Sequence, residues 1–329
     1  MKTMSIPAYY KNKEESEKAR AYLEDLIHQI MSIVLSGKTS ENLNQKVSEL
    51  FSIDFKPKFL DDTKFVVVSR YHVAITAMQI WQYKFATGKD CELLHTATLS
   101  RVENFLTHTY LPYCKSLQDS LLHKYSNHGA LGLMGECIAY KYIIHHRKNI
   151  AVQPWYKARL HACAEKLDKR VRKAVLRKNR WCGKKGELWV ENLRNKKGLY
   201  YTYLHLGALL RTMVTLTGER EKISDETLDK LHKAYQSYLN YFYDPDCWPY
   251  MDATKIPVLR QLQKLIFPSD KFIKPRIEGK EGALMDVCAN KIYPVSSPPF
   301  QYHKSYQELG PFPYSTKIMS SAYDLWRLL

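Results

Sequence analysis

Apolar residues recur at helical spacing along most of this chain, so that they fall on one face of each predicted helix. Strands have little support, because the β-branched run from Phe65 to Val68 continues into a helical pattern. Pro and Gly gather between Pro268 and Tyr314, which predicts long loops there. The predicted helices cover residues 14–35, 65–86, 93–111, 129–144, 155–176, 199–216, 224–242, 255–266 and 315–328.

Two of these predicted helices end in the same way. Gly88 and Gly218 each directly follow an apolar helix, where a glycine can adopt the left-handed conformation that closes the last turn. The shared ending favours repeated helix-turn-helix units, although no clear sequence period accompanies it. No segment has the composition of a linker. We therefore expect an all-α fold with one domain spanning residues 1–329, built from helical hairpins.

The charge balance points to a negatively charged partner. The chain has 329 residues, 50 Lys and Arg against 33 Asp and Glu, and a formal net charge of +17. Such an excess raises the local concentration of polyanions, which include nucleic acids, anionic membranes and acidic glycans. The 24 tyrosines suit sugar contacts, because tyrosine joins an apolar face to a polar tip, but they suit cores and interfaces equally well.

Several classes of protein lack their usual signals here. The seven cysteines include no Cys-x-x-Cys pair, which argues against a disulfide framework and a zinc site, and Cys137 and Cys163 fall on apolar helix positions typical of a core. No run approaches the roughly 18 apolar residues of a membrane span. No nucleotide-binding or metalloprotease motif occurs. We expect a soluble protein without metal or cofactor, a monomer rather than an oligomer, cytoplasmic unless a removed signal peptide sent it to the periplasm or outside.

The first candidate site segment lies directly before an apolar helix. Ser126 or Asn127 can cap that helix, and His128 follows. The positive end of a helix dipole favours a bound anion, so an amide and an imidazole at this place suit an anionic ligand. The alternative is that Asn127 only caps the helix and that His128 is a hydrogen-bonded structural residue.

The second segment contains Glu191, Arg194 and Tyr201. Arg194 and Tyr201 are seven residues apart, close to two helical turns, and would share one face. Gly198 lies between them, so the helix can instead begin there, with Arg194 on the preceding loop. Glu191 can hold the guanidinium of Arg194 in a bidentate pair. The alternative is a solvated charged loop followed by a core tyrosine.

These side chains match the needs of β-elimination in a uronate polymer. The reaction needs a neutralised C6 carboxylate, a base that removes the C5 proton and an acid that protonates the departing O4. Amide, imidazole and guanidinium groups stabilise the enolate-like intermediate as an oxyanion hole would. A tyrosine serves as the base only if its pKa falls from about 10, and a nearby cation favours this.

Asn-His-Gly before an apolar helix, followed by Gly186, Glu191, Arg194 and Tyr201 before another, resembles the alginate lyases of the poly(mannuronate) lyase type. The resemblance covers approximately residues 125–217. It implies an incomplete (α/α) toroid with a deep cleft that binds an acidic polysaccharide. Related lyases act on mannuronan, glucuronan and other uronans, so the polymer stays open.

The resemblance also implies roles for individual residues. Asn127, His128 and Arg194 would neutralise the carboxylate, and Tyr201 would act as the acid and also as the base. His128 is the alternative base. Tyr200 or Tyr203 can take the place of Tyr201, because three phenols lie close together in this stretch.

Further residues are candidates for substrate contacts. A helix start can line the cleft, and an aromatic loop suits stacking on sugar rings. These positions can instead be surface, capping or core residues. The substrate-binding candidates are Arg70, Tyr71, His72, Glu191, Tyr200, Tyr203, Trp248 and Tyr250.

A rival hypothesis starts from a basic stretch. Ten Lys and Arg residues fall between Lys166 and Lys185, and a basic helix can follow the phosphates of a nucleic acid. No nucleic-acid-binding motif accompanies it, and the same charges can guide a polyuronate or form a solvated face. A third possibility is a scaffold that binds acidic glycan without cutting it. We predict the lyase, with no nucleic-acid partner.

Overall fold

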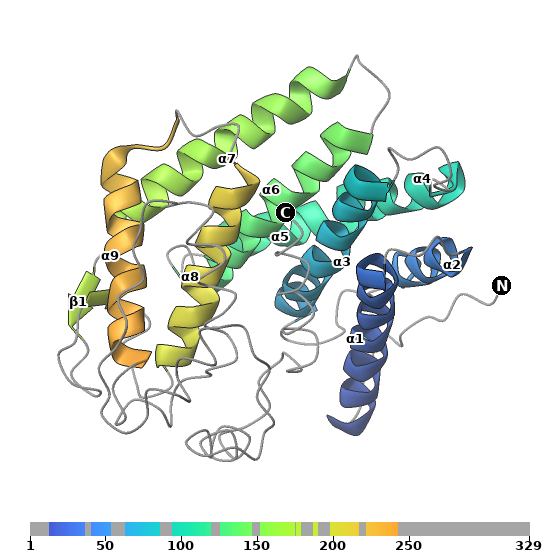
Figure 1. The fold of residues 1–329 in the computed structure, drawn as a ribbon, viewed down its shortest axis with the longest axis horizontal. Helices are drawn as coiled ribbons and strands as arrows, with labels where there is room; N and C mark the ends of the chain where they lie inside the picture. The colour runs from blue at the N-terminus through green and yellow to red at the C-terminus, as the bar shows by residue number, and fades with distance from the viewer. Residues whose placement is uncertain are drawn as a thin grey trace. The chain divides into compact units, whose positions relative to one another are not determined.

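The fold was examined in a computed structural model of the chain. Nearly all of its described residues are helical, which confirms the all-α class (Figure 1). One two-stranded antiparallel pair is the exception among them. The structure describes residues 13–36, 41–53, 63–85, 94–119, 126–146, 152–174, 176–178, 187–189, 198–216 and 222–242.

The described residues form two compact units. Unit 1 holds the helices from α1 to α5, the part of α6 from Leu131 onward and the start of α7 up to Leu160. Unit 2 holds the first residues of α6, the part of α7 from His161 onward, both strands, α8 and α9. The expected single toroid over residues 1–329 stays a prediction.

Most helices of unit 1 match the sequence pattern. Helices α1 and α3 agree closely with the prediction, and the run Phe65–Val68 is helical as expected. Helix α2 was not predicted; its buried Leu43, Val47 and Leu50 fall on one face of a short, mostly polar segment. The elements are α1 (Lys13–Ser36), α2 (Glu41–Leu50), α3 (Thr63–Phe85), α4 (Thr96–Phe105), η1 (Leu106–Tyr110) and α5 (Leu111–Asp119).

One long helical stretch contains a π-helical turn. The segment η1 joins α4 to α5 without a break, and Leu111 donates its backbone N–H to the carbonyl of Leu106. Pro112 comes next and has no N–H, and in a regular helix its ring clashes with the carbonyl four residues earlier. The wider π turn directly before the proline accommodates that ring.

The helices of unit 2 also begin as predicted. The long helix α7 is shorter than expected, because it ends at Lys173 and Leu176 belongs to a strand. That strand pairs with β2 in the register Leu176 to Trp189, a contact that the local helical pattern does not reveal. The elements, including the parts of α6 and α7 in unit 1, are α6 (Asn127–His146), α7 (Gln153–Lys173), β1 (Leu176–Lys178), β2 (Glu187–Trp189), α8 (Gly198–Thr215) and α9 (Asp225–Phe242).

Helices α5 and α6 approach each other closely because α6 carries glycines at the contact. A Cβ on Gly132 would lie 2.5 Å from the carbonyl oxygen of Cys114, and one on Gly135 would lie 2.7 Å from the Cys114 sulfur. The neighbouring Gln118 donates from its side-chain amide to Glu136 at 2.8 Å, so the buried carboxylate is hydrogen-bonded. This close packing accounts for the strongly apolar character of α6.

Some predictions fall outside the described residues. They are the helices at 255–266 and 315–328, the loops of 268–314 and the glycines Gly88 and Gly218. Among the described residues, Cys114, Cys137 and Cys163 are buried free thiols, as expected of Cys137 and Cys163. No described helix has both the length and the apolar character that crossing a membrane requires.

Candidate functional site

The start of α6 holds the best-defined part of the predicted site. Ser126 caps the helix: its Oγ accepts the backbone N–H of His128 at 3.2 Å, and its carbonyl accepts the N–H of Ala130 at 3.0 Å. Asn127 and His128 are therefore the first two residues of the helix, as the sequence predicted. Their position places them at the positive end of the helix dipole, which favours a bound anion.

Asn127 and His128 contact each other directly. Asn127 is only 3 % exposed, and its Oδ1 lies 3.0 Å from Nδ1 of the partly exposed His128. Because an amide oxygen only accepts hydrogen bonds, this contact places the imidazole proton on Nδ1 and leaves Nε2 as the acceptor of the ring. Asn127 thus orients His128, and the neutral imidazole has the form of a proton acceptor.

The tyrosine candidates lie on α8, which begins at Gly198, as the alternative to a longer helix anticipated. Tyr200 and Tyr201 occupy the first turn, where the helix dipole stabilises a negative charge such as a phenolate. The side chains of Tyr200, Tyr201 and Tyr203 lie outside the described residues, as does Arg194. The start of α6 and the whole of α8 belong to unit 2.

Further along α8, buried basic residues occupy the interior of unit 2. His205 comes one helical turn after Tyr201 and is buried, as are Arg211 on α8 and Arg170 on α7. Burial, and secondly the charge of Arg170, lower the pKa of His205 from 6.5 to about 3, so this imidazole is neutral. The sequence gave no sign of this pairing, since Arg170 looked like one more residue of a basic surface.

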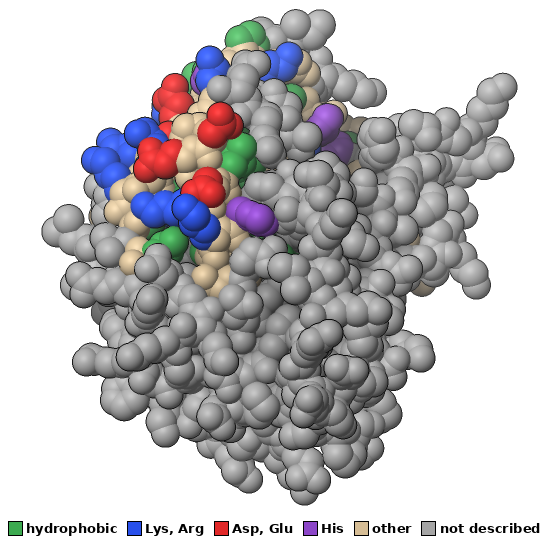
Figure 2. Space-filling view, turned by 60° about the vertical axis from the view of Figure 1, so that its left-hand side comes forward, with side chains coloured by type: hydrophobic (Ala, Val, Ile, Leu, Met, Phe, Trp, Pro, Cys, Tyr) green, Lys and Arg blue, Asp and Glu red, His purple; other side chains and the backbone are tan. Residues whose placement is uncertain are grey.

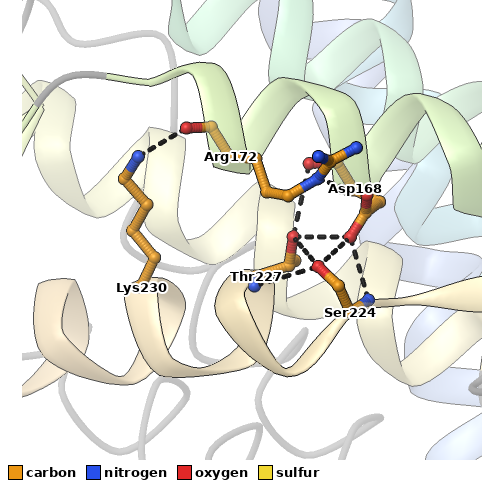
Figure 3. A network of polar contacts seen from close by, with 5 residues as sticks. All are labelled: Asp168, Arg172, Ser224, Thr227 and Lys230. Carbon is orange, nitrogen blue, oxygen red and sulfur yellow. Dashed lines mark hydrogen bonds and ion pairs between the residues drawn. The ribbon is translucent and has the colours of Figure 1, made fainter.

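A polar network fixes the start of α9 against α7 in the same unit (Figure 3). Oδ1 of Asp168 accepts hydrogen bonds from the backbone N–H of Ser224 at 2.9 Å, from the Ser224 hydroxyl at 2.5 Å and from the Thr227 hydroxyl at 2.7 Å. Its Oδ2 accepts from Nε of Arg172 at 2.6 Å. Ser224 also caps α9 by accepting the N–H of Thr227 at 3.3 Å.

The network has a structural role. Lys230 donates to the carbonyl of Arg172 at 2.6 Å and so satisfies an end carbonyl of α7 (Figure 3). Burial raises the pKa of Asp168, but the hydrogen bonds from Ser224, Thr227 and Arg172 outweigh it and lower the pKa to about 2. Since α9 contacts α8, the network also supports the helix that carries Tyr201.

Three predicted substrate contacts lie in unit 1 and are buried. Arg70 is 1 % exposed and gives two hydrogen bonds to Oε1 of Glu24, at 3.1 and 3.0 Å. Tyr71 donates its hydroxyl to the carbonyl of Leu50 at 2.8 Å and stacks on Phe105. Arg70 and Tyr71 therefore hold α3 against its neighbours.

His72, the third of these residues, is also buried. Two loop candidates, Trp248 and Tyr250, and the acidic candidate Glu191 fall outside the described residues. The predicted contact set is thus described only in part, and the part in unit 1 packs inside that unit.

The basic stretch is mixed with acidic side chains where the structure describes it. Lys166, Lys169 and Lys173 are exposed on α7, whereas Arg170 is buried. Figure 2 shows Lys and Arg interleaved with Asp and Glu on the described part of the visible surface. A uniform single-sign stripe that would follow phosphates is absent from that described surface. Across the described residues, no group of three or more His, Cys, Asp or Glu could hold a metal ion.

Comparisons of the chain with known protein families, with curated proteins and with solved structures found no match. The resemblance to alginate lyases therefore rests on the short motifs of the sequence.

Proposed function

We propose that the protein is a polysaccharide lyase that cleaves an acidic uronate polymer, with poly-mannuronate as the first candidate, by β-elimination. The observation that carries the proposal is the pair at the start of α6, where buried Asn127 holds the imidazole of His128 by its Nδ1–H. The proposed fold is an incomplete (α/α) toroid.

The proposed mechanism assigns the proton transfers to His128 and Tyr201. The substrate carboxylate lies near the positive helix ends of α6 and α8, where Arg194 neutralises it. Withdrawal of charge from the carboxylate acidifies the C5 proton. Tyr201 removes that proton and then protonates the departing O4, as one group can in a syn elimination. His128, with Nε2 as its acceptor, is the alternative base.

The arrangement of unit 2 supports this assignment in two ways. Buried Arg170, His205 and Arg211 make its interior basic, which suits an anionic substrate. Neutral His205, one turn beyond Tyr201, adds no positive charge of its own there. In this assignment Asn127 is a positioning residue that contacts the substrate through His128 rather than directly.

An absorbance assay tests the proposal. The protein is mixed with poly-mannuronate, poly-guluronate, glucuronan or hyaluronan, and the unsaturated uronate formed by elimination is followed in the ultraviolet. We expect a rise on at least one polymer that is lost in Tyr201→Phe and strongly reduced in His128→Ala. Asp229→Asn, an exposed change on α9, is the matched control and should keep full activity. No rise on any polymer would refute the lyase.

A further inference from the structure

The indole of Trp155 is an unusual feature of unit 1. It is the one large hydrophobic side chain that is strongly exposed among the described residues, with 52 % of its surface accessible. It lies in the first turn of α7, and Gln153 ties this turn to the end of α6 by donating to the carbonyl of Ile144 at 3.4 Å. An exposed ring on an anchored helix start is a candidate contact surface.

Two tyrosines hold the indole in one orientation. Tyr156 packs edge to face with Trp155 at a centroid distance of 4.8 Å and an interplanar angle of 87°, and Tyr140 does so at 6.3 Å and 88°. Both tyrosines are buried, so the indole rests on a fixed base. A ring that is already oriented loses little conformational freedom when a ligand binds.

A guanidinium lies beside the indole. Arg159 is one helical turn further along α7, and its Cζ lies 4.9 Å from the centroid of the Trp155 ring, within the range of a cation–π contact. The planar guanidinium can bind a carboxylate through two parallel hydrogen bonds. Lys157 is exposed nearby, and no Asp or Glu occurs between residues 152 and 164. The site therefore combines an apolar face with uncompensated positive charge.

We propose that Trp155 and Arg159 form a surface binding site for one uronate unit of an acidic polysaccharide. The C–H face of the sugar ring stacks on the indole, and the C6 carboxylate pairs with the guanidinium. The class of ligand rests on the proposed function, but the site is independent of the elimination chemistry. Nucleic-acid platforms stack successive bases on several aromatic rings, whereas a single exposed ring with an adjacent guanidinium fits one acidic sugar.

The test measures binding of the whole chain to purified mannuronate and glucuronate oligosaccharides by calorimetry, with a neutral glucan oligosaccharide and single-stranded DNA as comparison ligands. Trp155→Ala should weaken uronate binding about tenfold or more, as expected for a preorganised aromatic anchor. Arg159→Gln should weaken it about threefold to tenfold and reduce the preference over the neutral glucan. Lys157→Gln is the matched control and should stay within about twofold.

Several results would overturn the site. Trp155→Ala binding uronate as wild type does is one, and Trp155-dependent binding of single-stranded DNA in place of uronate is another. Trp155→Phe keeps an aromatic ring and should retain part of the affinity, which separates the loss of stacking from a folding defect. If wild type cleaves a uronan and Trp155→Ala binds it unchanged, the site fails and the lyase stands. If wild type binds uronate through Trp155 and cleaves no polymer, the lyase fails and the site stands.

Discussion

Replacement of Asp168 by Asn should destabilise the attachment of α9 to α7 in a pH-dependent way. Asn has the shape of the protonated carboxyl group, so Asp168→Asn removes the charge while it keeps the volume. Four hydrogen bonds to the carboxylate lose their charge, and the new amide N–H₂ faces donors in place of an acceptor. The start of α9 should then open more often.

The magnitude follows from the pKa. Lowering the pKa of Asp168 from 3.8 to about 2 corresponds to about 2.4 kcal/mol of stability at neutral pH. Because the side chain of Arg172 is 46 % exposed, solvent screens its share of the interaction. We therefore expect Asp168→Asn to lower the free energy of unfolding by about 1–2 kcal/mol.

The pH dependence has a definite sign. The folded-state pKa is lower than the unfolded-state value, so the contribution is fully present above pH 3.8 and is lost as the pH falls through about 2. Wild type and Asp168→Asn should therefore differ at neutral pH and converge in acid. Urea unfolding followed by circular dichroism gives the free energies, and amide hydrogen exchange shows whether the opening is local to α9.

A matched control isolates the network. Asp229 lies on the same helix, is exposed, and pairs with Lys233 at 2.7 Å, so Asp229→Asn should cost less than about 0.5 kcal/mol. Equal losses in the two variants, or a difference for Asp168→Asn that persists unchanged in acid, would refute this account of the network.

Three further predictions come from the buried contacts. Gly132→Ala should cost about 1–3 kcal/mol of stability in urea unfolding, because its Cβ would lie 2.5 Å from the backbone oxygen of Cys114; an unchanged unfolding midpoint would contradict the close packing. Glu24→Gln should cost about 2–4 kcal/mol, since it leaves buried Arg70 without its carboxylate, yet it should leave the KM for uronan unchanged. Stability should fall as the pH drops below 6.5 toward 3, because unfolding frees His205 to bind a proton, and His205→Gln should flatten that fall in urea unfolding.

The helices could be predicted from sequence where local signals agree. An apolar stripe and a polar cap at the start define α6 and α9, and both begin within two residues of the predicted position. The end of α7 could not be predicted, because Leu176 continues the apolar pattern of the helix and is drawn into a strand by pairing with Trp189. That pairing depends on residues outside the local sequence window.

The candidate site divides in the same way. The cap at Ser126 and the places of Asn127 and His128 follow from local sequence, and the structure confirms them. The burial of Arg70 does not, because its partner Glu24 is 46 positions away along the chain. A pattern of residue types indicates which chemistry is present, whereas long-range packing decides whether a side chain serves the site or the core.

The central claim is that bond breaking occurs by elimination, and the origin of the oxygen atoms in the products tests it most directly. The protein would digest the preferred uronan in water enriched in heavy oxygen, and mass spectrometry would read the new chain ends. Elimination predicts unsaturated ends without heavy oxygen, formed by wild type and lost in Tyr201→Phe. Saturated ends that carry heavy oxygen would show hydrolysis and would contradict the account.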